Sequence, residues 1–235
     1  MGASGVRIAG YLLWLAWVVW CVSAGTLAGI GLIEFNWGGP PYDGGFAGDL
    51  MLFGWFLALG QAPFVAGFFL ALRMEGRFAG GIGAAVFLAV LWAFFGLVGW
   101  TLGSYFEVWL QTPLYSGLRV LAGVLPWLCV AVLEAVVFVI ALDRVPPGAR
   151  LVCGLVWVAA VGTGGFLYEW WNFLDIAAMQ NPIKDAIGAY LEGLGVAENL
   201  AFQVVPLALS LPLLYGVPTG LALLAIHRLG TRPTP

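Results

Sequence analysis

One acidic residue lies deep inside an apolar stretch of this sequence. Glu134 stands nine residues before Asp143, which corresponds to about 13 Å along a helix. An unpaired carboxylate at that depth in hydrocarbon costs a few kcal/mol. No cation nearby in the sequence is an obvious partner, unless Arg119 or an arginine of another segment reaches in. We therefore expect Glu134 to be protonated, paired or facing a polar cavity, and it is the strongest candidate for a functional residue.

Three further acids recur in one setting, at the end of an apolar run and beside aromatic residues: Glu34, Glu107 and Glu169. If they converge, they form an acidic set that attracts cations or begins a proton path. Alternatively, each lies where a helix meets headgroups and water, within an ordinary belt of Trp and Tyr. Both interpretations stay open at the level of sequence.

A third group combines helix-breaking prolines with isolated amides inside apolar runs. Proline frees a backbone carbonyl, which a substrate can use when broken helices line a transport site. The same residues also produce kinks in helices that serve only for packing. The candidate positions are Gln61, Pro63, Pro126, Gln203, Pro206 and Pro212.

Several chemistries are excluded by residue type. His227 is the only histidine, and Cys21, Cys129 and Cys153 are isolated within apolar runs, so we expect no metal site and no haem. The sequence has no phosphate-binding glycine loop and no catalytic Ser/His/Asp set, so we expect no catalytic residues and a non-enzymatic protein. The absence of a basic cluster argues against nucleic-acid binding. The many Trp and Phe residues could hold an apolar ligand such as lipid, quinone or carotenoid.

Composition indicates the elements that position these residues. Of 235 residues, 62% are hydrophobic and 9% are charged, whereas a soluble domain carries about a quarter charged residues. We predict an all-α integral membrane protein with one domain over residues 1–235, because about 20 apolar residues span a bilayer. The predicted spans are residues 8–33, 49–72, 81–106, 117–142, 151–171 and 201–226.

The charged residues predict the orientation of these spans. Seven of the nine Lys and Arg residues fall on one side of a six-span arrangement, which we assign to the cytoplasm of a bacterial-type inner membrane: Arg7, Arg73, Arg77, Arg144, Arg150, Arg228 and Arg232. Both termini are then cytoplasmic. On the outer side, residues 182–195 follow Asn181-Pro182 with apolar residues at helical spacing, which predicts a short amphipathic helix on the membrane surface. It serves either as packing over the helix ends or as a gate.

Similar endings recur along the chain and predict three helical hairpins side by side. Gly60-Gln61 precedes Leu72-Arg73 by twelve residues, and Gly99-Trp100-Thr101-Leu102-Gly103 lies in the next span. In these features the chain resembles a group of uncharacterised bacterial multi-pass proteins whose Trp/Gly-rich helices alternate with helices ending in Leu-Arg. The resemblance covers about the second and third spans. It implies a fold and no activity.

Two functions remain open. The protein is a membrane-embedded subunit or scaffold, whose glycine-rich faces pack against lipids, other membrane subunits or a second copy of itself. Alternatively, it is a small transporter or channel for a proton, cation or small solute that uses Glu134 and the outer acids. These two functions can be distinguished by what surrounds Glu134: a cavity, a partner or lipid.

Overall fold

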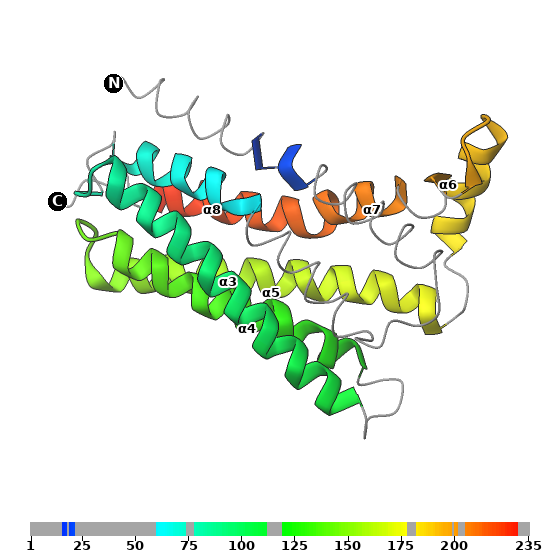
Figure 1. Ribbon diagram of the computed structural model, residues 1–235, viewed down its shortest axis with the longest axis horizontal. Coiled ribbons are helices and arrows are strands. Elements are labelled where there is room, and N and C mark those ends of the chain that lie inside the picture. Colours follow the sequence, from blue (N-terminus) through cyan, green and yellow to red (C-terminus); the bar gives the residue numbers. More distant parts are fainter. Residues whose placement is uncertain are drawn as a thin grey trace.

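The computed structural model describes residues 16–17, 19–21, 60–73, 78–111, 119–177, 182–198, 200–201 and 205–229 of the chain. All regular structure in these ranges is helical (Figure 1). Residues 60–73 form a helical segment, and the labelled elements follow it: α3 (Ile82–Gln111), α4 (Arg119–Ala141), α5 (Pro147–Ala177), α6 (Pro182–Gly193), α7 (Val205–Ser210), the π-helix η3 (Leu211–Gly216) and α8 (Val217–Leu229).

Four of these helical stretches are long and apolar enough to cross a membrane: Ile82–Glu107, Ala122–Ala141, Pro147–Trp171 and Ala208–Leu229. They correspond to the last four predicted spans, which agrees with the prediction of an all-helical membrane protein. The first predicted span is described only at residues 16–17 and 19–21, and the second at residues 60–73, all of them helical. The remainder of both predictions lies outside the described residues.

Helix α5 begins earlier than its predicted span. The sequence Val145-Pro146-Pro147-Gly148 is typical of a loop, and the prediction placed the start of the span at Leu151. The helix instead starts at Pro147. Proline fits the first helical turn because its missing N–H would have no partner there and its φ angle is already helical.

Glycines bring α4 close to both of its neighbours. A Cβ atom at Gly103 of α3 would lie 2.3 Å from the Cα atom of Pro126 in α4. On the other side of α4, a Cβ atom at Gly165 of α5 would lie 2.3 Å from Cγ of Trp127. Small residues at a helix interface allow such backbone approach. Gly103 and Gly165 are therefore covered within this chain, whereas a Cβ atom at Gly83 of α3 or Gly148 of α5 would have no described atom within 4 Å.

The last span changes geometry near its middle. The backbone N–H of Val217 donates to the carbonyl of Pro212, which is the five-residue spacing of a π-helix. Pro212 and Pro218 have no N–H and so cannot make the α-helical hydrogen bonds to the carbonyls four residues before them. This wide turn packs on α5, where a Cβ atom at Gly164 would lie 3.1 Å from Cα of Tyr215.

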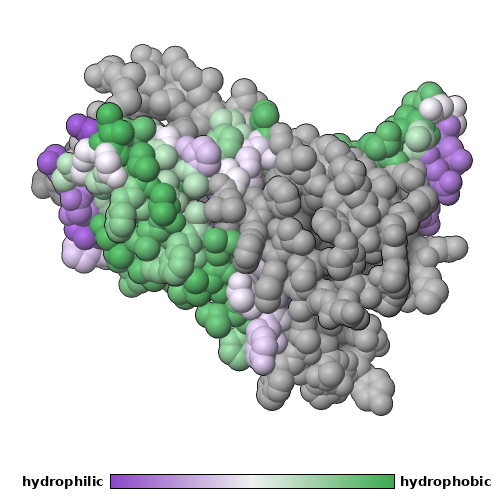
Figure 2. Space-filling view, in the orientation of Figure 1, coloured by the Kyte–Doolittle hydropathy of each residue, from purple (hydrophilic) through white to green (hydrophobic). Residues whose placement is uncertain are grey.

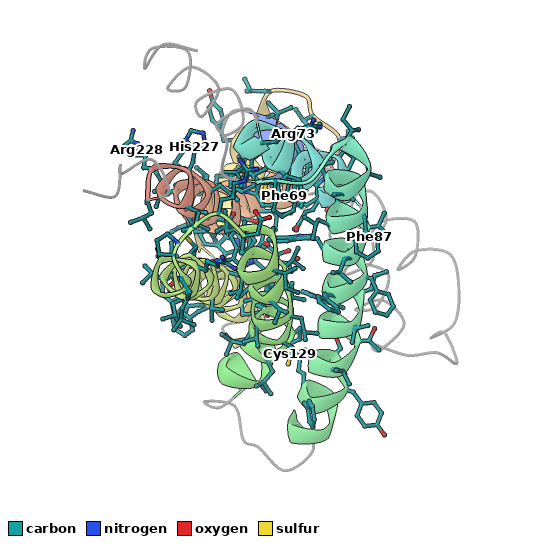
Figure 3. All side chains as sticks on the ribbon, turned by 90° about the vertical axis from the view of Figure 1, so that its left-hand side faces the viewer. Phe69, Arg73, Phe87, Cys129, His227 and Arg228 are labelled. Carbon is teal, nitrogen blue, oxygen red and sulfur yellow. The ribbon has the colours of Figure 1, made fainter. Side chains whose placement is uncertain are left out.

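Hydrophilic residues gather at the two ends of the described surface, and hydrophobic residues cover the helices between them (Figure 2). The end where α3 begins and α8 terminates carries Arg73, His227 and Arg228, which Figure 3 labels. Phe87 of α3 points away from the bundle in the same view, and 64% of it is exposed. The amphipathic helix α6 lies at the opposite end (Figure 1), close to its predicted bounds of 182–195.

Candidate functional site

The centre of the bundle is a cluster of buried aromatic rings. Trp157 of α5 contacts three of them, with ring centroids 5.1 Å from Trp92, 5.5 Å from Phe138 and 6.2 Å from Trp17. These rings come from four different helical segments. Because a buried indole N–H usually finds an acceptor, each tryptophan here also brings a hydrogen-bond donor into the apolar interior.

Glu134 of α4 lies within this cluster and is 0% exposed. The indole N–H of Trp157 donates to its Oε2 atom at 3.0 Å. Its other carboxyl oxygen, Oε1, has no hydrogen-bond partner in the part of the chain that the structure describes. Glu134 therefore faces the protein interior, with one oxygen occupied and one available.

A chain of donors leads from α3 towards this carboxyl group. The indole N–H of Trp92 donates to Oε1 of Gln61 at 3.1 Å, and the Gln61 side-chain amide donates to the hydroxyl oxygen of Tyr215 at 3.4 Å. The Tyr215 hydroxyl is close enough to Glu134 to interact with it electrostatically. Gln61, a candidate from the sequence, thus joins the region of Glu134 through Tyr215.

Tyr215 is held by the π-helical turn itself. The hydroxyl of Thr219 donates to the backbone carbonyl of Tyr215 at 2.7 Å and accepts from the indole N–H of Trp17 at 2.8 Å. The ring of Tyr215 packs on Trp127, with centroids 4.9 Å apart. Backbone, ring and hydroxyl of Tyr215 are each in contact with a different part of the bundle.

A second carboxyl group lies nearer the end at which α3 terminates. The indole N–H of Trp127 donates to Oε1 of Glu169 at 3.0 Å, and Glu107 of α3 is an electrostatic neighbour of Glu169. Glu107 is 5% exposed, whereas Tyr105 is 74% exposed and Phe106 is 52% exposed. Both acids therefore face the bundle while aromatic neighbours face outward. Glu34, the third member of the predicted set, lies outside the described residues.

The remaining candidates are spread over the bundle. Pro63 is exposed, Pro126 is buried against Gly103, and Pro212 is buried in the π-helix. Pro206 lies in α7, and Gln203 is outside the described residues. Pro63 lies two residues after Gln61, and Pro212 lies three residues before Tyr215 in the π-helix.

A small apolar cavity lies beside the central site and is lined by Trp17, Phe64, Val65, Phe68, Trp92, Phe138, Trp157 and Leu223. The hydrogen-bonding edges of Trp92 and Trp157 are used by Gln61 and Glu134. Within the described ranges no three His, Cys, Asp or Glu residues come together as a metal site would require. Among the described residues at the centre, Glu134 provides one carboxyl group that can bind and release a proton.

The sequence did not single out Trp157 or Tyr215, although both contain a usable signal. Tryptophan in membrane spans favours the interface, and yet Trp17, Trp92 and Trp157 occur in the middle of apolar runs. Their donors need acceptors there, and Glu134 is the one acid in the middle of a span. Tyr215 lies between Pro212 and Pro218, where the α-helical hydrogen bonds are interrupted.

No family model, no curated protein and no solved structure matches this chain. Function is therefore inferred from the arrangement of these side chains.

Proposed function

We propose that this protein is a small, non-enzymatic membrane transporter or channel in which Glu134 binds and releases a proton during transport. The observation that carries the proposal is the fully buried carboxyl group with one oxygen bonded to Trp157 and the other without a partner. Ionisable groups inside membrane spans are costly and commonly belong to ion or proton pathways. Glu134 makes no ion pair within the described residues, so a structural salt bridge does not account for it.

A proton fits this position better than a metal cation. Metal cations such as Ca²⁺ take six to eight oxygen ligands, whereas the surroundings of Glu134 are indole, phenyl and phenol rings. A proton needs only one carboxyl oxygen. The neutral acid is also the form that a closed apolar pocket accommodates at the lower cost.

The acids of the second pair provide an approach to this site. Trp127, which bonds Glu169, precedes Glu134 by seven residues on α4. Seven residues are about two helical turns, or about 10 Å, on one face of the helix. Glu107 and Glu169 thus form a second acidic pair beside Trp127, and in this proposal the pair attracts protons or cations towards the central carboxyl.

The alternative is a membrane-embedded subunit or scaffold that binds lipid, quinone or pigment, and the aromatic cavity favours it. Its main support in the sequence was the set of glycine-rich faces available to partner helices. Gly99, Gly103 and Gly165 instead contact α4 of the same chain. We therefore rank transport first.

The test is proton movement across liposomes. The full-length protein is reconstituted with an entrapped pH-sensitive dye, and a potassium gradient with valinomycin supplies the voltage. We expect Glu134→Gln to lower the flux to that of protein-free liposomes, because the amide cannot exchange a proton. Glu192→Gln, which changes an exposed acid of α6, is the matched control and should conduct like the unmodified protein. Equal flux in the unmodified protein and Glu134→Gln would contradict the proposal.

A further inference from the structure

The geometry points to Tyr215 as the residue that couples movement of the π-helical turn to proton binding at Glu134. In this inference the Tyr215 hydroxyl donates to Oε1 of Glu134, directly or through one water, when the carboxylate is ionised. It does not donate there when Glu134 carries its proton. The inference rests on the proposed function and names the residue that links its proton site to the π-helical turn.

The direction of the hydrogen bonds carries the first step. Gln61 donates to the oxygen of Tyr215 and is itself fixed by the donor of Trp92. The phenol oxygen therefore acts as an acceptor in this bond, and its own proton remains available for a second partner. No described hydrogen bond uses that proton. Oε1 of Glu134 is a buried acceptor without a described partner, and Glu134 is an electrostatic neighbour of Tyr215.

The two states of Glu134 then have different partners. As a neutral acid it accepts from Trp157 and keeps its own proton on the carboxyl group. After that proton leaves, the carboxylate accepts from Trp157 at Oε2 and from Tyr215 at Oε1. Tyr215 retains its proton in both states, so one proton is released and no covalent bond other than the carboxyl O–H changes. Two donors satisfy the charged form, which otherwise would be buried with an unpaired oxygen.

The π-helical turn supplies the movement. One residue more or less in a turn rotates the side chains that follow by about 100°, and π-helical turns are frequent at functional sites. Pro212 lies in the turn and Pro218 follows it in α8, and the backbone of the turn packs against Gly164. A return to α-helical geometry would move the hydroxyl of Tyr215 relative to Glu134 while Trp157 stays on α5.

Glu134 is the one carboxyl group among the described side chains that face the site. Residues 60–73, α3 and α5 present the neutral side chains Gln61, Trp92 and Trp157. Residues 16–21 present the thiol of Cys21, which is an electrostatic neighbour of Tyr215. Glu107 and Glu169 belong to the second pair, and the titratable side chains of α8, His227 and Arg228, lie in its last turn.

The test is infrared difference spectroscopy of the full-length protein in lipid nanodiscs across a pH step, with and without ring-labelled tyrosine. We expect a carboxylic C=O band from Glu134 and, with it, a label-sensitive band of the tyrosine C–OH group. Tyr215→Phe keeps the ring against Trp127 and should remove the tyrosine band while the carboxyl band remains. Tyr168→Phe, which changes the other buried tyrosine ring beside Trp127, should keep both bands.

Glu134→Gln provides a second arm that does not depend on the folding of Tyr215→Phe. Tyr215 is unchanged in this variant. Its band should nevertheless vanish, because the carboxylate that accepts the hydrogen bond from its hydroxyl group is missing. A tyrosine band that persists in Glu134→Gln or in Tyr215→Phe would overturn the inference and leave the proposed function standing. A spectrum with no carboxyl band assignable to Glu134 would overturn both.

Discussion

Glu134 and Glu169 receive the same hydrogen bond in two regions of one bundle. Each carboxyl group accepts an indole N–H at 3.0 Å, from Trp157 in the centre and from Trp127 two turns away. Their second oxygens differ. Oε1 of Glu134 has no described partner, whereas Oε2 of Glu169 lies over Gly123, 3.0 Å from where a Cβ atom would stand.

The tryptophan–glutamate hydrogen bond is therefore common to both regions, and the surroundings of the second carboxyl oxygen are what differs. Glu169 is partly exposed and has Glu107 as an electrostatic neighbour, so it lies where charge collects at the edge of the bundle. Glu134 is enclosed on all sides and has a donor, Tyr215, within electrostatic reach. In the proposed function, the centre exchanges the proton and the outer pair attracts it.

The largest expected effect compares the two acids in liposomes. Glu134→Gln should reduce voltage-driven proton flux to background. Glu169→Gln should reduce it only about threefold to tenfold, because Glu107 remains and a focusing charge changes local ion concentration by roughly tenfold or more. Equal loss in both variants would remove the distinction between centre and edge.

A smaller effect concerns the two tryptophan donors. Trp157→Phe should lower the free energy of unfolding by about 2–3 kcal/mol, since it leaves both oxygens of a buried carboxyl group without a donor. Trp127→Phe removes the same kind of donor beside Glu169, which is partly exposed. Its loss of unfolding free energy should be about 1 kcal/mol smaller than that of Trp157→Phe.

Thermal or denaturant unfolding in detergent micelles measures both changes. Trp170→Phe is the control, because Trp170 is 48% exposed and should shift stability little. A larger loss of stability in Trp127→Phe than in Trp157→Phe would show that the outer hydrogen bond stabilises the protein more than the central one.

The smallest effect compares two glycines. Gly123→Ala places a methyl group 3.0 Å from Oε2 of Glu169 and must displace that side chain, at a cost of up to about 1 kcal/mol. Gly154→Ala meets Val139 and Ala135 at 3.5 Å and 3.6 Å, which is ordinary contact, so its stability should change by no more than about 0.5 kcal/mol. The same unfolding assay compares the two variants, and a greater loss in Gly154→Ala would mean that the α4–α5 contact near Glu134 is tighter than described.

The apolar runs were sufficient to predict the four described spans, because a bilayer requires long hydrophobic helices whatever they pack against. Glu134 could likewise be chosen from sequence, since it is the one acid in the middle of a run. Its partners could not, because Trp157 and Tyr215 reach it only through the packing of α4, α5 and η3. The π-helical turn also escaped prediction: the prolines indicate a break, but its geometry depends on the contact of Tyr215 with Gly164. The start of α5 was wrong by four residues because Pro147 can open a helix as well as a loop.

The most direct measurement of the central claim is the pH-dependent carboxylic C=O band, recorded by infrared difference spectroscopy on the full-length protein in nanodiscs. The unmodified protein, Glu134→Gln and Glu169→Gln are compared across the same pH step. If Glu134 exchanges a proton, a band present in the unmodified protein is absent from Glu134→Gln and retained in Glu169→Gln. Spectra in which Glu134→Gln keeps every carboxyl band of the unmodified protein would contradict the claim.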